Sequence, residues 1–188
     1  MELQEAILKR RAIRRFTADA VTDEELQQLF EAVRWSPSWS NSQVWEFVVA
    51  RDRNLIQKLT ETYRMPKGLN PATKCSLAAS ALIVVCAKTG ISGCYEGKES
   101  TKHTNWYMFD LGIATQTLCL KAHEMGLGTV VVGLFDHDSC NSLLALPEGY
   151  ESVAIIPIGH PAVEVKAGPA RKTVAEMVHL DQFGQKMF

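Results

Sequence analysis

WYMFDLGIATQTLCLKAHEM, residues 106–125, is the segment that most constrains the fold. Its apolar residues recur at alternating steps of three and four, which predicts one long helix. Phe109, Ile113 and Leu120 add apolar character on its other sides, and a helix that is apolar nearly all round must be covered nearly all round. Either a central position in the core of a monomer or a subunit interface would supply that cover.

Short strands surround this helix in the sequence. Gly126 ends the helix, and GTVVVG at 128–133 predicts a strand. WEFVVA at 45–50, LIVVCA at 82–87 and VAIIPIG at 153–159 predict three more, and the second of these is apolar enough to be fully buried. Helices that alternate with short β-branched strands indicate an α+β or α/β sandwich.

The shorter helices have recognisable starts. A capping box, in which Thr22 and Glu25 exchange hydrogen bonds, opens one helix. Asn70 followed by Pro71 opens another, because a proline at the first helical position loses no hydrogen bond. The other predicted segments are a helix at 2–10 that buries Leu3, Ala6 and Ile7, a mobile glycine-rich loop at 89–103, a helix at 138–145 capped by Asp138, and an extended arm at 160–188 with a short helix at 174–179.

Composition predicts one globular domain, residues 1–188, with 46% hydrophobic and 22% charged residues. A formal net charge of −1 gives no global attraction to nucleic acid or to a membrane surface. We expect a cytoplasmic protein, because no segment has the roughly 20 apolar residues that cross a bilayer and the start lacks a signal-peptide pattern. Five cysteines without a C-x-x-C pair, and five histidines without H-E-x-x-H spacing, predict no metal site.

KRRAIRR, residues 9–15, is the sharpest local feature, with five cations in seven residues. These charges repel one another, so something is expected to offset the repulsion. A solvated helix end is one explanation, because cations are favoured near a helix C-terminus. A phosphate site is another, because guanidinium groups make paired bonds to phosphate oxygens. A nucleic-acid patch is the third, and the near-neutral charge and the lack of further basic or aromatic stripes disfavour it.

Three other stretches are candidates for binding. SPSWSNSQVW at 36–45 can hold the edge of a heteroaromatic ring, or it can be an ordinary polar connection. GLGTVVVG at 126–133 has its glycines after a helix and before a strand, which is the reverse of the dinucleotide-binding order, so a Rossmann domain is excluded. Gly133 would then let the backbone approach a flat ligand. GPARK at 168–172 is a second, smaller cationic site.

Taken in order, these motifs resemble the nitroreductase family of FMN flavoproteins. Each motif is weak alone, whereas their order and spacing are specific together. The resemblance implies an α+β sandwich with a central, mostly antiparallel sheet flanked by helices, the long helix at a homodimer interface, and an extended C-terminal arm. The matching segments, within 10–45 and 105–183, are RRAIR at 10–14, PSWSNSQVW at 37–45, DLGIA at 110–114, GLGT at 126–129, GHP at 159–161 and RK at 171–172.

The resemblance also implies which residues contact FMN, and it divides them between two subunits. Arg14 would face the pyrimidine edge of the ring, where its charge stabilises reduced flavin, and no catalytic acid or base is required. The partner subunit would contribute Pro37, Ser38 and Asn41. The remaining contacts, from the same subunit as Arg14, are Arg10, Arg11, Ala12 and Arg171 around the phosphate, Val131, Val132 and Gly133 beside N5, and Asn70 at the polar edge of the ring.

Three positions depart from the family pattern. Ala12 stands where a serine is usual, Val44 replaces a proline, and Thr117 replaces a common asparagine. None of these changes removes a charge, so FMN binding is expected to survive them.

The activity that the resemblance implies is reduction of small nitroaromatic or quinone-like molecules with electrons from NADH or NADPH. The flavin would carry the chemistry by ping-pong hydride transfer through N5. The loop at 89–103, with Tyr95 and the nearby Trp106, would select the acceptor. The alternatives are a non-catalytic FMN-binding or sensing protein, and a variant flavin reaction such as reductive dehalogenation.

Overall fold

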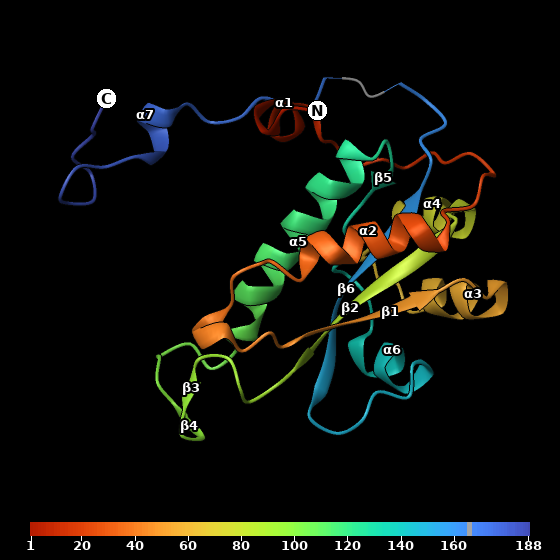
Figure 1. Cartoon of the computed structure of the whole chain (residues 1–188), viewed down its shortest axis with the longest axis horizontal. Coiled ribbons are helices and arrows are strands. Elements are labelled where there is room, and N and C mark those ends of the chain that lie inside the picture. The colour runs from red at the N-terminus through yellow and green to blue at the C-terminus, as the bar shows by residue number, and fades with distance from the viewer. Residues whose placement is uncertain (165–166) are drawn as a thin grey trace.

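A four-stranded sheet in the order β1–β2–β6–β5 runs through the centre of the molecule (Figure 1). The computed structural model describes residues 1–164 and 167–188. All three pairings in the sheet are antiparallel, which confirms the predicted sheet type. The strands are β1 (Trp45–Ala50), β2 (Ala81–Lys88), β5 (Gly128–Thr129) and β6 (Tyr150–Gly159), and a separate hairpin joins β3 (Cys94–Tyr95) and β4 (Lys98–Glu99).

Helices cover both faces of this sheet, which confirms the predicted sandwich. None of those described is long and apolar enough to span a membrane. The helices are α1 (Leu3–Lys9), α2 (Asp23–Val33), α3 (Arg53–Glu61), α4 (Ala72–Ala78), α5 (Tyr107–Glu124), α6 (His137–Leu143) and α7 (Val174–Met177), with a 3₁₀ turn η1 at Trp39–Asn41.

β2 is the middle of the sandwich, and its alternating side chains separate two cores. Successive residues of a strand point to opposite faces of the sheet. Ile83 and Val85 therefore pack with α2 and α5, whereas Leu82 and Val84 pack with α3, α4 and α6. All four side chains are fully buried, as the unbroken apolar run LIVVCA predicts.

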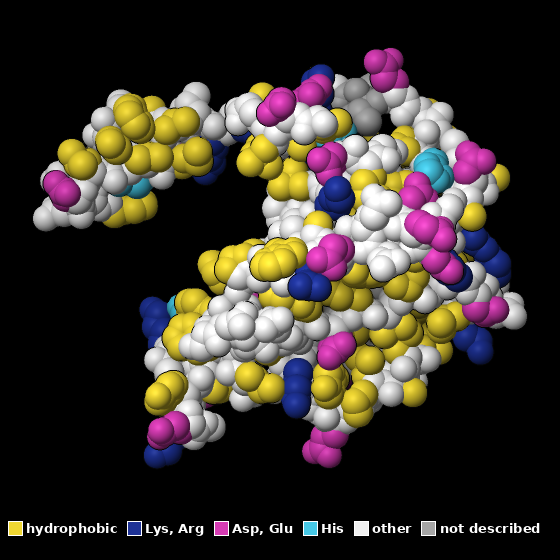
Figure 2. Space-filling view, viewed as in Figure 1, with side chains coloured by type: hydrophobic (Ala, Val, Ile, Leu, Met, Phe, Trp, Pro, Cys, Tyr) yellow, Lys and Arg dark blue, Asp and Glu magenta, His cyan; other side chains and the backbone are white. Residues whose placement is uncertain are grey.

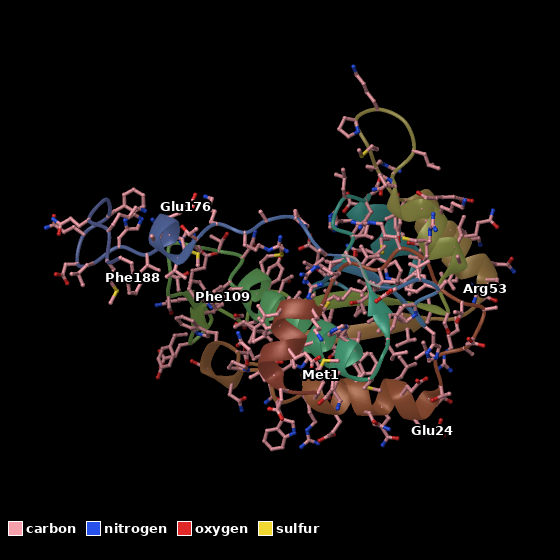
Figure 3. The ribbon with its side chains drawn as sticks, turned by 90° about the horizontal axis from the view of Figure 1, so that it is seen from above. Met1, Glu24, Arg53, Phe109, Glu176 and Phe188 are labelled. Carbon is pink, nitrogen blue, oxygen red and sulfur yellow. The ribbon has the colours of Figure 1, made fainter. Side chains whose placement is uncertain are left out.

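The helix predicted at 106–125 is confirmed as α5, and it is only partly covered by its own subunit. Leu111 and Leu118 are buried against the sheet. Met108 and Phe109 remain 50% and 62% exposed on the other side, and Phe109 is labelled in Figure 3. The cover that this outer side needs does not come from the residues described for this subunit.

The predicted burial of the N-terminal helix is wrong for an isolated subunit. Ala6 is buried against α5, but Leu3 and Ile7 are exposed. A helix of seven residues cannot bury two faces against one neighbour, so its second apolar side is left open.

Two predicted boundaries that follow α5 in the sequence are also wrong: the end of the strand at 128–133 and the cap of α6. The strand expected at 128–133 stops after Thr129, and Val132 pairs only singly with Ile155, because the chain turns away from the edge of the sheet. The cap of α6 is Asp136 rather than Asp138, since the Asp136 side chain accepts a hydrogen bond from the backbone N–H of Ser139.

The C-terminal arm is confirmed over its described part. Residues 167–188 lead away from the sheet and end in α7 and a loop beyond it (Figures 1 and 2). Residues 165–166 of the predicted arm lie outside the described residues. The arm carries several exposed apolar side chains: Val174, Met177, Leu180, Phe183, Met187 and Phe188.

Candidate functional site

The arginine segment lies against the edge of the sheet, held there by backbone pairing. The N–H of Ile13 donates to the carbonyl oxygen of Thr129 at 2.9 Å, beside a parallel bridge between Ala12 and Thr129. Gly128 makes this approach possible, because a Cβ at that position would lie 2.7 Å from the Cβ of Ile13. The glycine of the GLGT motif therefore has a packing reason inside the subunit.

A cavity of about 680 Å³ opens beside this segment, between it and the start of the C-terminal arm. Its size is in the range of small-molecule and cofactor sites. Arg171 reaches the cavity from the arm, so residues some 160 positions apart in the sequence share one wall. We call this feature the cationic cavity; the predicted residues that line it are Arg10, Arg11, Ala12, Arg14 and Arg171.

The guanidinium groups of the cationic cavity have no acidic partner among the described residues. Glu164 also lines the cavity, but no carboxylate oxygen lies within 4.0 Å of these arginines. Arg11 donates from Nη1 to the carbonyl oxygens of Leu8 and Arg10, at 2.7 and 2.8 Å. Its Nε atom is buried without a partner. Positive charge thus gathers where no described carboxylate makes an ion pair with it.

His123 is affected by the positive charge of the arginine segment, and Gly168 by its close packing. Burial, and next the positive charge of Arg10, hold the pKa of His123 below its ordinary value. Gly168 passes so near the arginine segment that a Cβ there would lie 2.5 Å from the Nε of Arg11. The glycine of GPARK is therefore required for the arm to begin at this point.

The segment after β5, residues 131–133, is largely apolar and is not among the residues that line the cationic cavity. Val132 is buried, whereas Val131 is half exposed. A Cβ at Gly133 would meet nothing within 4 Å, so no contact with a described residue explains the missing side chain. Asn70 lies beside the segment at 131–133, where its amide donates to the carbonyl oxygen of the next residue, Leu134, at 3.4 Å.

The predicted start of α4 is one residue early, because the N-cap is Pro71 rather than Asn70 and the helix begins at Ala72. The Oδ1 of Asn70 accepts from the backbone N–H of Ala72 at 2.9 Å, and its Nδ2 donates to the carbonyl oxygen of Arg64 at 2.9 Å. These bonds fix the orientation of the Asn70 amide.

Pro37, Ser38 and Asn41 lie at the other end of α5. Their loop is bonded to Asp110 in the first turn of the helix. The cationic cavity lies near the last turns of α5, about 20 Å away at about 1.5 Å per helical residue. One subunit therefore does not bring these three residues to the same cavity as the arginines.

A family model described as Nitroreductase family matches residues 7–160. The chain belongs to this family. Among its relatives, a protein of Archaeoglobus fulgidus that is provisionally named NADH dehydrogenase/NAD(P)H nitroreductase is 29% identical over 167 residues, which cover 87% of each chain.

Solved structures of family members share the fold over nearly the whole chain. A nitroreductase family protein from Clostridium novyi NT has a TM-score of 0.76 at 27% identity, covering all of this chain and 97% of the other. An FMN-dependent nitroreductase from Clostridium difficile R20291 has a TM-score of 0.77 at 25% identity, covering 96% and 99%. These comparisons confirm the recognised family and its α+β fold.

Sequence reasoning missed a role for one residue of this family member, Asp110. It lies within the DLGIA motif, and its side chain is only 1% exposed. An ionisable residue in the first turn of an otherwise apolar helix was the available signal, since such a group is rarely buried without partners.

The departures from the family pattern are accommodated by local packing. The hydroxyl of Thr117 donates to the carbonyl oxygen of Ile113 at 3.1 Å, and it accepts from Ser36 at 3.0 Å. Val44 is buried in the core beneath α2 and α5. Ala12 takes part in the bridge to Thr129, which needs no side-chain oxygen.

Proposed function

We propose that this chain is an FMN-dependent NAD(P)H oxidoreductase that reduces small organic acceptors. The observation that carries the proposal is the cationic cavity, where five arginines meet without an acidic partner among the described residues. Family membership and the FMN-dependent relative support FMN as the ligand. The identity of the acceptor, with nitroaromatics and quinones as the leading classes, belongs to the same proposal.

The residues present fit the phosphate of FMN. Arg10, Arg11 and Arg171 offer guanidinium donors on one wall, and charge-assisted bonds to phosphate are among the stronger hydrogen bonds in proteins. The partnerless Nε of Arg11 is explained if it belongs to a cradle for this anion. Ala12 contributes backbone only. Arg14, from the same wall, places positive charge beside the pyrimidine edge of the ring.

The apolar segment at 131–133 fits the flat ring of FMN. Gly133 leaves space that no described side chain fills, and Val131 and Val132 place backbone along it. Asn70, held by its hydrogen bonds, faces the polar edge of the ring. FMN bound there supplies hydride transfer at N5, alternately with a nicotinamide and an acceptor. The protein contributes binding and orientation, and it excludes water from one face of the ring.

A homodimer completes this site in our proposal. Pro37, Ser38 and Asn41 are some 20 Å along α5 from the cationic cavity, so a second copy must supply them to the same FMN. Exposed apolar residues on α1, α5 and the C-terminal arm support such an interface. Exposed patches of this kind are typical of surfaces that another chain covers. We also propose that residues 1–188 form one domain and that the enzyme works in the cytoplasm.

The test is to purify the protein and titrate it anaerobically with NADH and with NADPH. We expect a yellow protein whose flavin absorbance bleaches with at least one donor and returns when an acceptor such as a quinone is added. A colourless protein that cannot be reconstituted with FMN would overturn the proposal. A yellow protein that neither donor bleaches would establish the flavin-binding or sensing alternative instead. Halide release from a halogenated aromatic would identify the dehalogenation variant.

A further inference from the structure

The loop that joins α2 to β1 contains an unusual backbone. Ser40, Asn41 and Gln43 have φ angles of 44°, 56° and 46°. Positive φ is disfavoured for residues with a side chain, and asparagine is only partly exempt. Three such residues within four positions, none of them glycine, persist only where surrounding bonds hold them. We call residues 38–43 the clamped turn.

Asp110 provides bonds on both sides of Ser40 and Asn41, two of the three disfavoured residues. Its Oδ1 accepts from the backbone N–H of Trp39 at 3.1 Å, and its Oδ2 accepts from the hydroxyl of Ser42 at 3.3 Å. Ser40 and Asn41 lie between these two attachment points. The Asp110 carboxylate is bonded to the residues before and after Ser40 and Asn41, so it fixes the conformation of the turn between them.

The carboxylate of Asp110 is committed to this role. It is 1% exposed, and no Lys, Arg or His nitrogen among the described residues lies within 4.0 Å of it. Its third bond, from the hydroxyl of Ser92 at 2.6 Å, ties the same carboxylate to the loop between β2 and α5. A position in the first turn of α5 also favours negative charge, because of the helix dipole.

We propose that Asp110 is a positioning residue that presets Asn41 for the flavin held by the partner subunit. This inference rests on the proposed function, since it takes Asn41 as an FMN contact. Asp110 touches neither FMN nor the acceptor and acts through the clamped turn. Through Ser92 it also joins that turn to the loop at 89–103, so the flavin contact and the acceptor-side loop share one buried anchor.

The test compares three variants of the full-length protein for FMN dissociation constant and for amide exchange in residues 38–43. Asp110→Ala removes every acceptor and leaves the N–H of Trp39 unpaired, so FMN binding weakens about tenfold or more and exchange in the clamped turn accelerates. Asp110→Asn restores binding to within about threefold, because its amide oxygen accepts from Trp39 while the serine hydroxyls rotate to accept from its amino group. Tyr107→Phe is the matched control, since it deletes another hydrogen bond of α5, the one from Tyr107 to Glu151, which does not involve the clamped turn.

Wild-type affinity and exchange in Asp110→Ala would overturn the inference. Equal weakening of FMN binding in Asp110→Ala and Tyr107→Phe would also overturn it, because general destabilisation would then explain both. If Asp110→Ala does not fold, Ser42→Ala replaces it, and unchanged exchange there counts against the clamp. A wild-type protein that binds no FMN would overturn the proposed function, whereas the exchange measurement still tests the clamp without flavin.

A second comparison tests the link to the acceptor-side loop. Ser92→Ala frees that loop and leaves both attachments of the clamped turn in place. We expect KM for the acceptor to change while the FMN dissociation constant stays within about twofold, since a single neutral partner is lost. A change in FMN affinity as large as that of Asp110→Ala would show that the two loops are not separately anchored.

Discussion

The cationic cavity and the clamped turn lie at opposite ends of α5, and their polar groups are satisfied in different ways. In the cavity, arginines gather without an acidic partner among the described residues, and the Nε of Arg11 is buried and unpaired. In the clamped turn, the polar groups on both sides of a disfavoured backbone are bonded to Asp110 within the subunit. We therefore propose that a ligand completes the cavity, whereas the turn is already held by bonds within the subunit. A site assembled from one half of each kind combines strong anion binding with fixed geometry.

The largest effect on FMN binding should come from removing arginines of the cationic cavity. Replacing Arg10 and Arg171 together by alanine should weaken FMN binding by at least about 100-fold, from two charge-assisted bonds of about 1.5–3 kcal/mol each. Fluorescence titration of FMN measures the change. The matched control is the double variant Arg34→Ala/Lys58→Ala, which removes the same charge at exposed positions away from the cavity and should bind normally. Full retention of FMN by the first variant would show that the phosphate is held elsewhere.

The next largest effect should come from separating the two subunits, one of which supplies the cationic cavity and the other the clamped turn. Phe109→Glu places a charge on the exposed apolar side of α5 and should shift the protein from dimer to monomer in analytical ultracentrifugation. Because FMN contacts would then come from one subunit only, FMN affinity should fall about tenfold or more. Leu143→Glu, on α6 at the opposite face of the sheet, is the control and should leave both properties unchanged. A Phe109→Glu dimer with normal FMN content would place the interface on another surface.

Two glycines of one segment distinguish packing from ligand space. Gly128→Ala brings a Cβ to 2.7 Å from that of Ile13, so the free energy of unfolding should fall by about 1–3 kcal/mol. Gly133→Ala meets nothing within 4 Å and should change stability by less than about 0.5 kcal/mol, yet weaken FMN binding. Urea unfolding without added FMN measures both. Similar losses of stability in the two variants would mean that Gly133 is also a packing residue.

The smallest effect concerns pH. The pKa of His123 lies below its ordinary value of 6.5, first because of burial and then because of Arg10. The unfolded chain thus takes up the proton more readily, and the stability that this side chain contributes is present above pH 6.5 and lost as the pH falls through the folded pKa. In His123→Gln, the loss of stability between about pH 7.5 and 5.5 should be smaller than in the wild type. Bound FMN phosphate should reduce the wild-type loss by offsetting Arg10, and identical pH profiles for the two proteins would contradict this account.

The sequence indicated which residues belong to the cationic cavity and to the clamped turn, but not how distant segments come together to form them. The arginine segment that lines the cavity stood out in the sequence because five cations in seven residues repel one another, and a phosphate site there stays a prediction. The meeting of this segment with Arg171 follows from the path of the arm and could not be read from spacing. The buried role of Asp110 was missed for the same reason, since its partners Trp39, Ser42 and Ser92 come from two other parts of the chain.

Local pattern by itself determined several elements of this protein. The stripe of α5 and the buried run of β2 depend on residues close together in the sequence, and both are observed. Tertiary structure alone decided three matters: where the strand at 128–133 stops, which sides of α1 and α5 stay open, and which loops Asp110 ties together. These depend on which surfaces remain after distant segments have packed, and a one-dimensional pattern does not contain that information.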